Sequence, residues 1–369
     1  MKSITVDYTK RLAEEPGTGH NRWHEAIAPV IEAAPGEEVE IQTRDAFDGQ
    51  ISEATTAEDL RCCDLNRVHP LTGPVYVAGA AAGDLLEVEI CGMKPAAFAY
   101  TVQVPGFGFL RDAFPEPYIA KWRIKDGFAE SADLPGVRIP DGSFVGVIGV
   151  APSAALRETI QRREANLLGR GGMVLPPEKE GAVPAAEPIA SQALRTIPPR
   201  ENGGNLDIKQ LSKGAGLSLP VFVDGALFSV GDAHFAQGDG EACGTAIEMA
   251  GAILVRFALH KGEAARRGIR FPRFARDDYY SPPELAAPKR FLATTGLSIG
   301  EDGTNESGDA TLSARNALLA MIDVLVERGW TRQQAYAICS VAVDLKLSEL
   351  VDVPNFVVSA FLPLDIFGQ

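Results

Sequence analysis

The residues of this chain that are best suited to chemistry gather between Pro198 and Glu248. This stretch combines many glycines and apolar residues with several acids and one histidine, among them Asp207, Asp224, Asp232, His234, Asp239 and Glu241. If Ser229–Phe235 is extended, Asp232 and His234 are two residues apart and point to the same face of a strand. A carboxylate oxygen beside an imidazole nitrogen offers two ligands to a divalent metal. The last two acids of the list repeat this spacing, so the pattern predicts a polar site.

Each of these acids also has a plainer interpretation. Asp-Gly and Gly-Asp pairs are common in turns, because aspartate bonds to its own backbone and glycine accepts positive φ. His234 alone could be a hydrogen-bonded histidine of the core, since apolar residues follow it. The clustering nevertheless favours a functional site, because the whole chain has five histidines.

Long and unusual stretches of sequence, this motif among them, are spread along the chain from about His20 onward. They are PPRENGGNLDIKQL (198–211), LPVFVDGALFSVGDAHFAQGDGEACGTAIE (219–248), PGEEVEIQTRDAFDGQ (35–50), HPLTGPVYVAGAAAGDLLEVEI (69–90) and SVAVDLKLSELVDVPNFVVSAFLPLDIF (340–367). They resemble the acetamidase/formamidase family. The resemblance implies hydrolysis of a short aliphatic amide, formamide or acetamide, to the carboxylate and ammonia. It also implies a divalent metal, for which we expect Zn²⁺, a small neutral amide as the partner molecule, and a homo-oligomer.

The resemblance further implies a ring of polar residues around the metal. We expect the metal ligands to come from this ring: Asp45, His69, Asp232 and His234, with His20 at its edge. Three other residues are expected to act in catalysis: Glu241, Asp207 and Asn205. Glu241 would be the general base, and Asn205 would donate a hydrogen bond to the substrate carbonyl. Which residues contact the metal and which orient the ligands stays open.

Three of these candidate residues have alternative interpretations. Asp45 follows the strand-like sequence EVEIQT and could cap a turn. His69 precedes a proline, which holds it extended, but it could equally be a loop histidine bonded to the backbone. Glu241 could order the glycine-rich loop 238–244.

Hydrolysis of an unactivated amide makes three chemical demands. It needs an activated water, a positive partner for the developing oxyanion, and an acid that protonates the leaving nitrogen. A zinc-like ion meets the first two, because it lowers the pKa of bound water toward about 7 and polarises the carbonyl. A catalytic metal needs about three or four protein ligands, so residues outside the central motif must contribute.

The elements that position these residues are mostly strands. Asp224-Gly225 between two apolar runs predicts a hairpin of Leu217–Val223 with Ala226–Val230. Further strands are expected at Glu38–Thr43, Val75–Ala78, Leu85–Ile90, Ser143–Val150 and Phe356–Leu362. Thr245–His260 is apolar enough for a strand or a buried helix. Helices are expected at Pro152–Arg163, at Ser313–Arg328, and from a Thr331 N-cap with Gln334 in a capping box.

These elements predict a β-rich α+β fold, with β-sandwich or jelly-roll-like and small-barrel portions and a C-terminal α+β segment. We expect residues 1–150 to form an N-terminal β-rich domain, 151–204 a Pro-rich excursion or linker, and 205–369 a mixed α+β domain that carries the GNLD and GDAHFAQGDGE motifs. The loops of 101–145 are expected to shape a pocket.

The composition narrows the class of protein. The chain has 369 residues, 46% of them hydrophobic, and a net charge of −14, which disfavours nucleic acid and anionic membranes as partners. No apolar run approaches the roughly 18 residues of a membrane span, and the N-terminus lacks a secretion signal. The cysteines, Cys62, Cys63, Cys91, Cys243 and Cys339, are odd in number and predict free thiols in the cytoplasm. Cys243 is a less favoured candidate nucleophile.

Two rival functions remain at this point. A cupin-like metal oxygenase would also hold a metal on strands, but Asp-x-His here departs from the His-x-His expected there. A non-catalytic small-amide binding protein on the same scaffold would keep the pocket without releasing ammonia. Loss of a motif acid would mark such a protein, and the motif acids are present.

Overall fold

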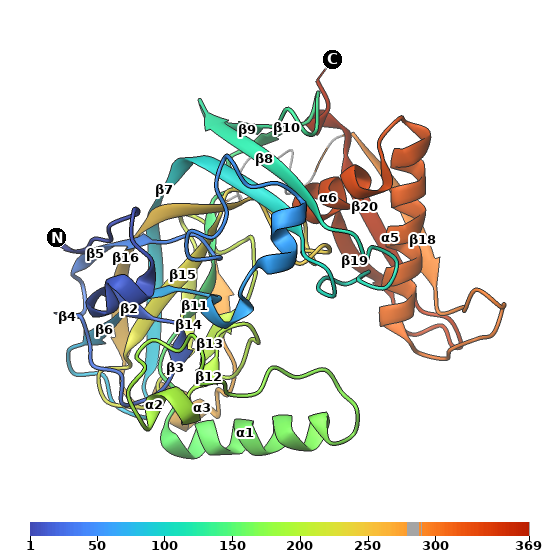
Figure 1. Cartoon of the computed structure of the whole chain (residues 1–369). Coiled ribbons are helices and arrows are strands. Elements are labelled where there is room, and N and C mark those ends of the chain that lie inside the picture. The colour runs from blue at the N-terminus through green and yellow to red at the C-terminus, as the bar shows by residue number, and fades with distance from the viewer. Residues whose placement is uncertain (279–287, 289, 369) are drawn as a thin grey trace.

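Three β-sheets organise the chain in the computed structural model, which describes residues 1–278, 288 and 290–368 (Figure 1). The largest has 15 strands. Its main path runs β10 (Arg138–Pro140), β9 (Phe128–Glu130), β8 (Tyr118–Lys125), β7 (Leu85–Gln103), β16 (Glu248–His260), β15 (Phe228–His234), β11 (Phe144–Gly149) and β13 (Gly203–Asn205). Other strands attach beside this path: β1 (Lys2–Ile4), β2 (Gly19–His20), β4 (Ile31–Ala33), β5 (Glu38–Thr43), β6 (Leu71–Val77), β14 (Gly216–Pro220) and β17 (Arg273–Ala275).

The remaining elements surround this sheet. A two-stranded sheet joins β3 (Arg22–Trp23) to β12 (Leu194–Arg195), and a three-stranded sheet has the order β18 (Phe291–Leu297), β20 (Val357–Pro363), β19 (Asp344–Glu349). The α-helices are α1 (Ala154–Leu168), α2 (Ile189–Gln192), α3 (Glu263–Arg267), α5 (Ala310–Glu327) and α6 (Arg332–Ala342). Short 3₁₀ turns lie at Leu12–Glu14, Pro16–Thr18, Glu58–Cys62, Leu65–Arg67 and Leu364–Ile366. Within the described ranges, every helix is too short or too polar to cross a lipid bilayer.

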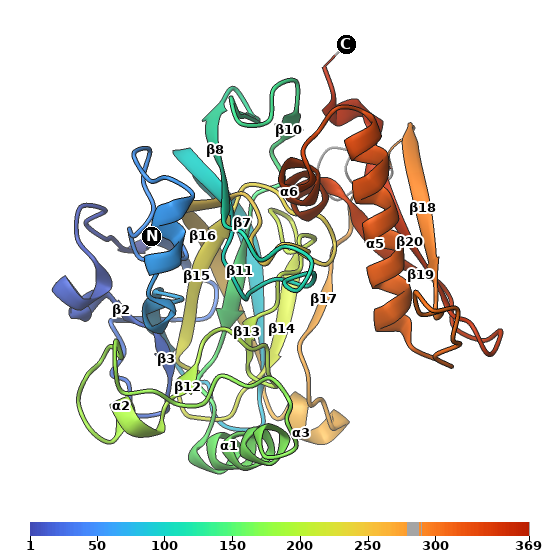
Figure 2. The same cartoon turned by 45° about the vertical axis from the view of Figure 1, so that its right-hand side comes forward.

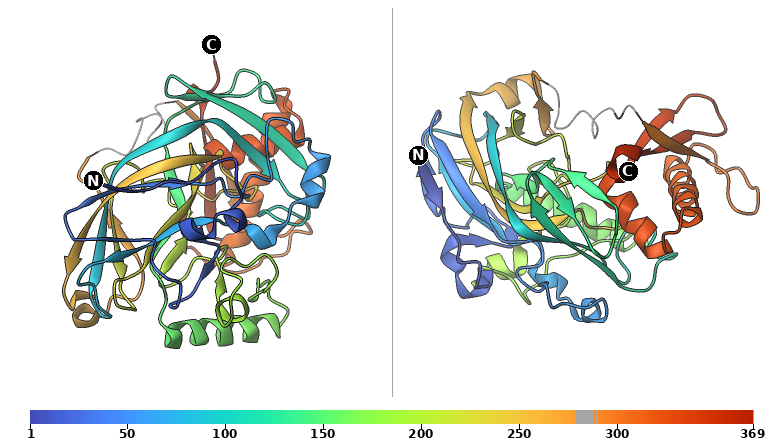
Figure 3. Two further views of the ribbon diagram at one scale, coloured as in Figure 1. Left: turned by 60° about the vertical axis from the view of Figure 1, so that its left-hand side comes forward. Right: turned by 90° about the horizontal axis from the view of Figure 1, so that it is seen from above.

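The C-terminal elements form a unit beside the main sheet. In Figure 2, α5 lies along the three-stranded sheet and α6 lies between that sheet and the main one. Seen from above, the unit stands at one side of the main sheet (Figure 3). One hydrophobic core nevertheless contains residues of both parts, for example Val88 of β7, Phe228 of β15, Met321 of α5 and Tyr336 of α6. The two sheets are therefore held together by shared packing.

Local sequence accounts for several elements. β5 has the predicted bounds and buries alternate residues, as a strand with one face on the core must. Of the run from Thr245 to His260, Glu248–His260 forms β16, which is hydrogen-bonded to β7 on one side and to β5 on the other. α6 begins after Thr331, which exchanges hydrogen bonds with Gln334 at 2.9 and 3.2 Å, so the predicted capping box is confirmed.

Other expectations need correction. The predicted hairpin is wrong: β14 pairs with β7 and β17, whereas β15 pairs with β6, β11 and β16. Asp224 is exposed in a turn between them, where Ala226 and Leu227 have positive φ. The strand-rich class is confirmed, but in the part of the chain that the structure describes the strands do not close into a small barrel. The jelly-roll-like detail and the three-part domain division stay predictions, although β7 and β11 pair with strands from beyond residue 205.

Candidate active site

Strands from distant parts of the chain bring the polar residues together at the junction of β15 and β16. β15 carries Asp232 and His234, and β16 begins with Glu248. Asp207 follows β13, and Glu241 lies in the loop between β15 and β16. The predicted strand placement of Asp232 and His234 is thus observed. Asp232 nevertheless departs from regular alternation, because its φ is +59°.

Gly146 of β11 makes room for this arrangement. It faces Asp232 across the β11–β15 ladder, where pairs are formed on both sides of the two residues. Its carbonyl accepts hydrogen bonds from the backbone N–H groups of Leu206 and Asp207, at 2.9 and 3.3 Å. A Cβ at this position would lie 2.5 Å from Asp207 Oδ1, 2.6 Å from Asp232 Oδ2 and 2.7 Å from His234 Cε1. The missing side chain therefore lets three functional groups converge on one point.

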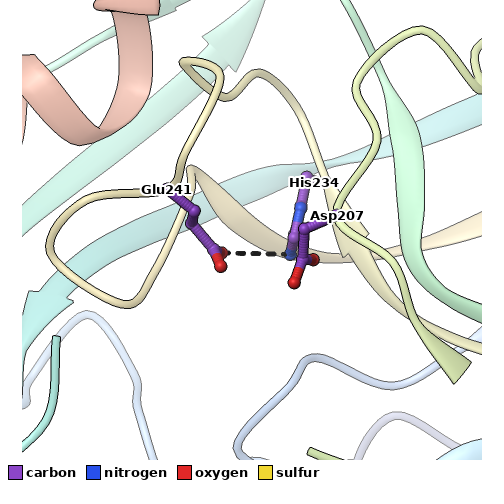
Figure 4. A group of neighbouring side chains, drawn as sticks. All are labelled: Asp207, His234 and Glu241. Carbon is purple, nitrogen blue, oxygen red and sulfur yellow. Dashed lines mark ion pairs between the residues drawn. The ribbon is translucent and has the colours of Figure 1, made fainter. Parts of the chain in front are cut away.

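His234 is the centre of the cluster. Its Nε2 lies 3.1 Å from Glu248 Oε2, 3.3 Å from Asp232 Oδ1 and 4.0 Å from Glu241 Oε1. Figure 4 shows the Glu241 carboxylate directed toward the His234 imidazole, with Asp207 beside that ring. Among the described residues, neither ring nitrogen has a hydrogen bond of acceptable geometry, and the same holds for Asp207 Oδ1 and Glu248 Oε2. Buried polar atoms without partners are rare and expensive, so they indicate a ligand position.

Burial and mutual repulsion set the protonation of the cluster. Burial, reinforced by Asp232, raises the pKa of Asp207 to about 7, and burial raises the pKa of Glu248 to about 7 against the opposing charge of His234. Burial and the neighbouring Asp207 raise the pKa of Glu241 well above its ordinary value. These three carboxyls hold protons far more readily than exposed acids do.

Asp232 and His234 behave as an ion pair. Burial alone would raise the pKa of Asp232, but the charges of His69 and His234 outweigh it and the pKa is lowered. Burial disfavours the charged form of His234, yet Glu248 and Asp232 together hold its pKa well above its ordinary value. Two buried acids, Asp232 and Glu248, and two partly buried acids, Asp207 and Glu241, thus face two histidines. The negative charge that these acids can carry exceeds the positive charge of the histidines.

His69 and Asn205 border the cluster. His69 Nε2 lies 3.8 Å from Asp232 Oδ2, and its backbone N–H donates to Thr196 Oγ1 at 2.6 Å. Asn205 Oδ1 is a buried atom with no hydrogen bond to any described residue. Both residues line the same cavity as the acids, so the structure places them where they can touch a small bound molecule.

A cavity of about 240 Å³ opens onto the cluster. Its polar end contains His69, Asn205, Asp232, Glu241 and Glu248, and its remaining lining is largely apolar. Val104, Phe107, Phe109 and Arg111 of the loop after β7 contribute to that lining, in agreement with the expectation that this loop shapes a pocket.

Two predicted ligands lie in other hydrogen-bond networks. Asp45 accepts hydrogen bonds from the backbone N–H groups of Phe47 and Gly49 and from the Tyr100 hydroxyl, at 3.0, 2.8 and 2.5 Å. His20 donates from Nδ1 to the Arg22 carbonyl at 2.5 Å, and its Nε2 accepts from Ser229 Oγ at 2.8 Å. Asp45 thus caps a turn, and both ring nitrogens of His20 are engaged in hydrogen bonds.

The contacts of two other candidates, Asp239 and Cys243, indicate structural roles. Asp239, two residues before Glu241, has a carboxylate oxygen 3.9 Å from Lys209 Nζ. Its backbone N–H donates a hydrogen bond to Asp344. Cys243 is buried, and its N–H donates to Ser340 Oγ at 3.0 Å. Burial raises the pKa of the Cys243 thiol to about 11, which disfavours the thiolate that a nucleophile requires.

Glu248 was missed by sequence reasoning. Its side chain is buried, and its Oε1 accepts from the backbone N–H of Ala246 at 2.7 Å, which turns Oε2 toward His234. The sequence contained a signal for it, because Glu248 is an acid within a largely apolar run. Such a run is expected to be buried, and a buried acid needs a partner.

The donor set fits a divalent metal ion. Two groups of three residues have ligand atoms within 4.8 Å of one another: Asp207, His234 and Glu241, and Asp232, His234 and Glu248. Zinc bonds of about 2.1 Å hold tetrahedral ligand atoms about 3.4 Å apart. The separations of 3.1 and 3.3 Å around His234 are close to that spacing. A cation would also compensate the excess of buried acid.

Comparison with known proteins gives this site a family. The acetamidase/formamidase family matches residues 5–369. A formamidase of Methylophilus methylotrophus is 34% identical, over 100% of this chain and 94% of that protein. An acetamidase of Mycolicibacterium smegmatis is 36% identical, over 91% of this chain and 88% of that protein. The solved structure of a gamma lactamase from Delftia acidovorans is 35% identical in sequence and has a TM-score of 0.94. The match covers 100% of this chain and 94% of that one.

These similarities extend along the whole chain and so include the segments that carry the cluster. They offer no support for an oxygenase. The chain therefore belongs to the acetamidase/formamidase family, and it is an amide-cleaving hydrolase.

Proposed function

We propose that the protein hydrolyses small neutral primary amides, with formamide and acetamide as the simplest, at the cluster around His234 and with the help of a divalent metal ion. The observation that carries this proposal is the convergence of four acids, two buried and two partly buried, and two histidines beside a small cavity. The relatives named formamidase and acetamidase support the same reaction.

Asp232, His234 and Glu248 would hold the metal, because their ligand atoms have the shortest separations. Bound there, an ion of the zinc type supplies a Lewis acid for the amide carbonyl and lowers the pKa of water. His69, beside Asp232, orients that carboxylate. His20 and Asp45 are left out of this set because their polar atoms are engaged elsewhere.

The remaining residues would handle protons and the substrate. Glu241 takes a proton from the attacking water and delivers it to the amide nitrogen, so that the C–N bond breaks and ammonia leaves. Asp207 shares the buried acid environment of Glu241 and keeps its pKa raised. Asn205, with its amide on the cavity wall, donates a hydrogen bond to the substrate carbonyl.

Ammonia release from formamide and acetamide tests the proposal. Exhaustive chelation should abolish it and Zn²⁺ should restore it. Glu241→Gln and His234→Ala should each lower kcat by at least about a hundredfold, whereas Asp224→Asn, which changes an exposed acid of the same motif, should leave kcat within twofold. Ammonia release that survives verified metal removal would eliminate the metal but keep the amidase.

Ring opening of a small lactam is a second candidate activity. It breaks the same kind of C–N bond, and the observation that favours it is the similarity to the gamma lactamase structure over the whole chain. The product would be an amino acid without free ammonia, so product analysis with 2-pyrrolidinone separates the two activities.

A further inference from the structure

The cavity at the candidate site is larger than the smallest amides need. One water occupies about 30 Å³ in the liquid, so about 240 Å³ holds about eight water-sized atoms. Formamide has three non-hydrogen atoms and acetamide has four. If a cation and the attacking water take two of the eight places, and the amide oxygen and nitrogen two more, about four places remain for carbon.

The wall around those places is apolar and firmly packed. Phe47, Val68 and Val104 line the cavity, and all three are buried members of one hydrophobic cluster. Ile197 and Phe107 also line it and pack against this cluster. Core side chains therefore bound the apolar part of the space, together with residues of the loop after β7.

Close backbone packing holds one side of this wall in place. A Cβ at Gly244 would lie 2.6 Å from Phe107 Cδ1, and a Cβ at Gly108 would lie 2.7 Å from the Cys243 carbonyl. Phe109 N–H also donates to the Ala242 carbonyl at 2.9 Å. Because the Phe107 ring rests against the loop that carries Glu241, the acyl end and the catalytic end of the cavity keep a constant separation.

We infer that the apolar part of this cavity is an acyl-binding chamber, and that the preferred substrates are neutral primary amides with an apolar chain of about four carbons, counting the carbonyl carbon. This inference rests on the proposed amide hydrolysis. A chain of this length fills the chamber, whereas formamide leaves most of the apolar wall in contact with water. Each additional CH₂ that is buried contributes about 0.8 kcal/mol, which is about fourfold in kcat/KM.

The test is a series of linear amides from formamide to octanamide with the purified, metal-replete protein, measured as ammonia release. We expect kcat/KM to rise about fourfold per carbon from acetamide to butanamide, about fifteenfold in all, and to fall by octanamide. A value that is highest for formamide or acetamide and declines with every added carbon would overturn the inference while leaving the amidase intact. Absence of ammonia from every member would overturn both.

Ile197→Phe provides a direct test of the chamber, because Ile197 is partly buried and its replacement adds three carbons to the wall. We expect the ratio of kcat/KM for butanamide to that for acetamide to fall at least tenfold in this variant, because the longer chain loses more of its space. Leu297→Phe, a similar change at an exposed position of β18, is the matched control and should alter neither. Competitive inhibition of acetamide hydrolysis by butyrate gives a second measurement, and a Ki that does not change in Ile197→Phe would count against the chamber.

Discussion

At the scale of single residues, the site is built from backbone conformations that most side chains avoid. Asp207, Asp232 and Glu241 have φ values of +49°, +59° and +42°. Such left-handed residues cost free energy of order 1–3 kcal/mol each and persist where the surrounding structure imposes them. Here they turn three carboxyls toward His234, so the strain is concentrated where the chemistry is proposed.

Gly146→Ala tests how closely these groups must approach. The added methyl would contact Asp207, Asp232 and His234 at distances below 3 Å. We expect kcat for acetamide to fall at least about a hundredfold, because displacement of catalytic groups by 1 Å is enough for such a loss. Gly92→Ala, whose methyl would meet Leu254 Cβ at 3.8 Å, is the control and should stay near wild type. An active Gly146→Ala enzyme would contradict the convergence of the three groups.

His20 leads to a prediction about acid stability. Burial lowers its pKa to about 4, so the folded state holds it neutral while the unfolded chain protonates it near pH 6.5. Its contribution is complete above pH 6.5 and is lost as the pH falls toward 4. At pH 4.5 this protonation costs about 2.5 kcal/mol of the free energy of unfolding.

His20→Gln should therefore flatten the decline in stability between pH 6.5 and pH 4. The measurement is urea unfolding of wild type and variant at pH 7 and pH 4.5. The difference between the two proteins should shrink by about 2.5 kcal/mol at the lower pH. A difference that is the same at both pH values would show that His20 does not titrate as described.

At the scale of elements, the loop that carries Glu241 is fastened to the junction of α6 and β19. Gly238 N–H donates to the Ser340 carbonyl at 2.9 Å, and Asp239 N–H donates to Asp344 Oδ1 at 3.0 Å. Asp344 also forms a buried ion pair with Lys209, two residues after Asp207. This ionic network joins both acid-bearing segments of the site to the C-terminal unit.

Lys209→Met should leave the buried Asp344 carboxylate without its cation. We expect the free energy of unfolding to fall by about 3–5 kcal/mol, because an unpaired buried charge is expensive. Chemical denaturation measures this loss, and kcat should fall with it as the Glu241 loop is released.

Two comparisons separate this effect from a general loss of charge. Lys94→Met, which breaks the exposed pair with Glu40, should cost at most about 1 kcal/mol. The double change Lys209→Met with Asp344→Leu should recover much of the stability, because apolar residues can replace a buried ion pair. Equal losses for Lys209→Met and Lys94→Met would refute the role of the buried pair.

At the scale of the whole molecule, the fold is stabilised without disulfides. All five cysteines lie in the described residues and are free. Cys62 is exposed, Cys63 and Cys91 are partly exposed, and Cys243 and Cys339 are buried. Their accessibility therefore reports on the integrity of the entire structure.

Thiol labelling of the native protein should follow this order. Cys62 should react first, Cys63 and Cys91 more slowly because burial raises the pKa of each, and Cys243 and Cys339 after unfolding. A reductant should leave the melting temperature unchanged. Rapid labelling of Cys339 in the native state would contradict the packing of α6 against the main sheet.

Sequence alone was sufficient where the determining interactions are local. The strand Glu38–Thr43 follows from alternation and the start of α6 from a capping box that spans four residues. The strand-rich class follows from the same short-range patterns. The close approach of Asp232 and His234 was also accessible, because it depends on a spacing of two along one strand.

Only the tertiary structure decided which distant residues share the site. Strand pairing brings Glu248 beside His234, and Gly146 of β11 leaves room for the acids around that histidine. His20 is hydrogen-bonded to Ser229, 209 positions away in the sequence. Asp45 is of a residue type that binds metals, yet its carboxylate caps a turn and accepts a hydrogen bond from the Tyr100 hydroxyl. Residue type and local spacing limit which groups can do chemistry, but the packing of strands far apart in the chain determines which of them face one another.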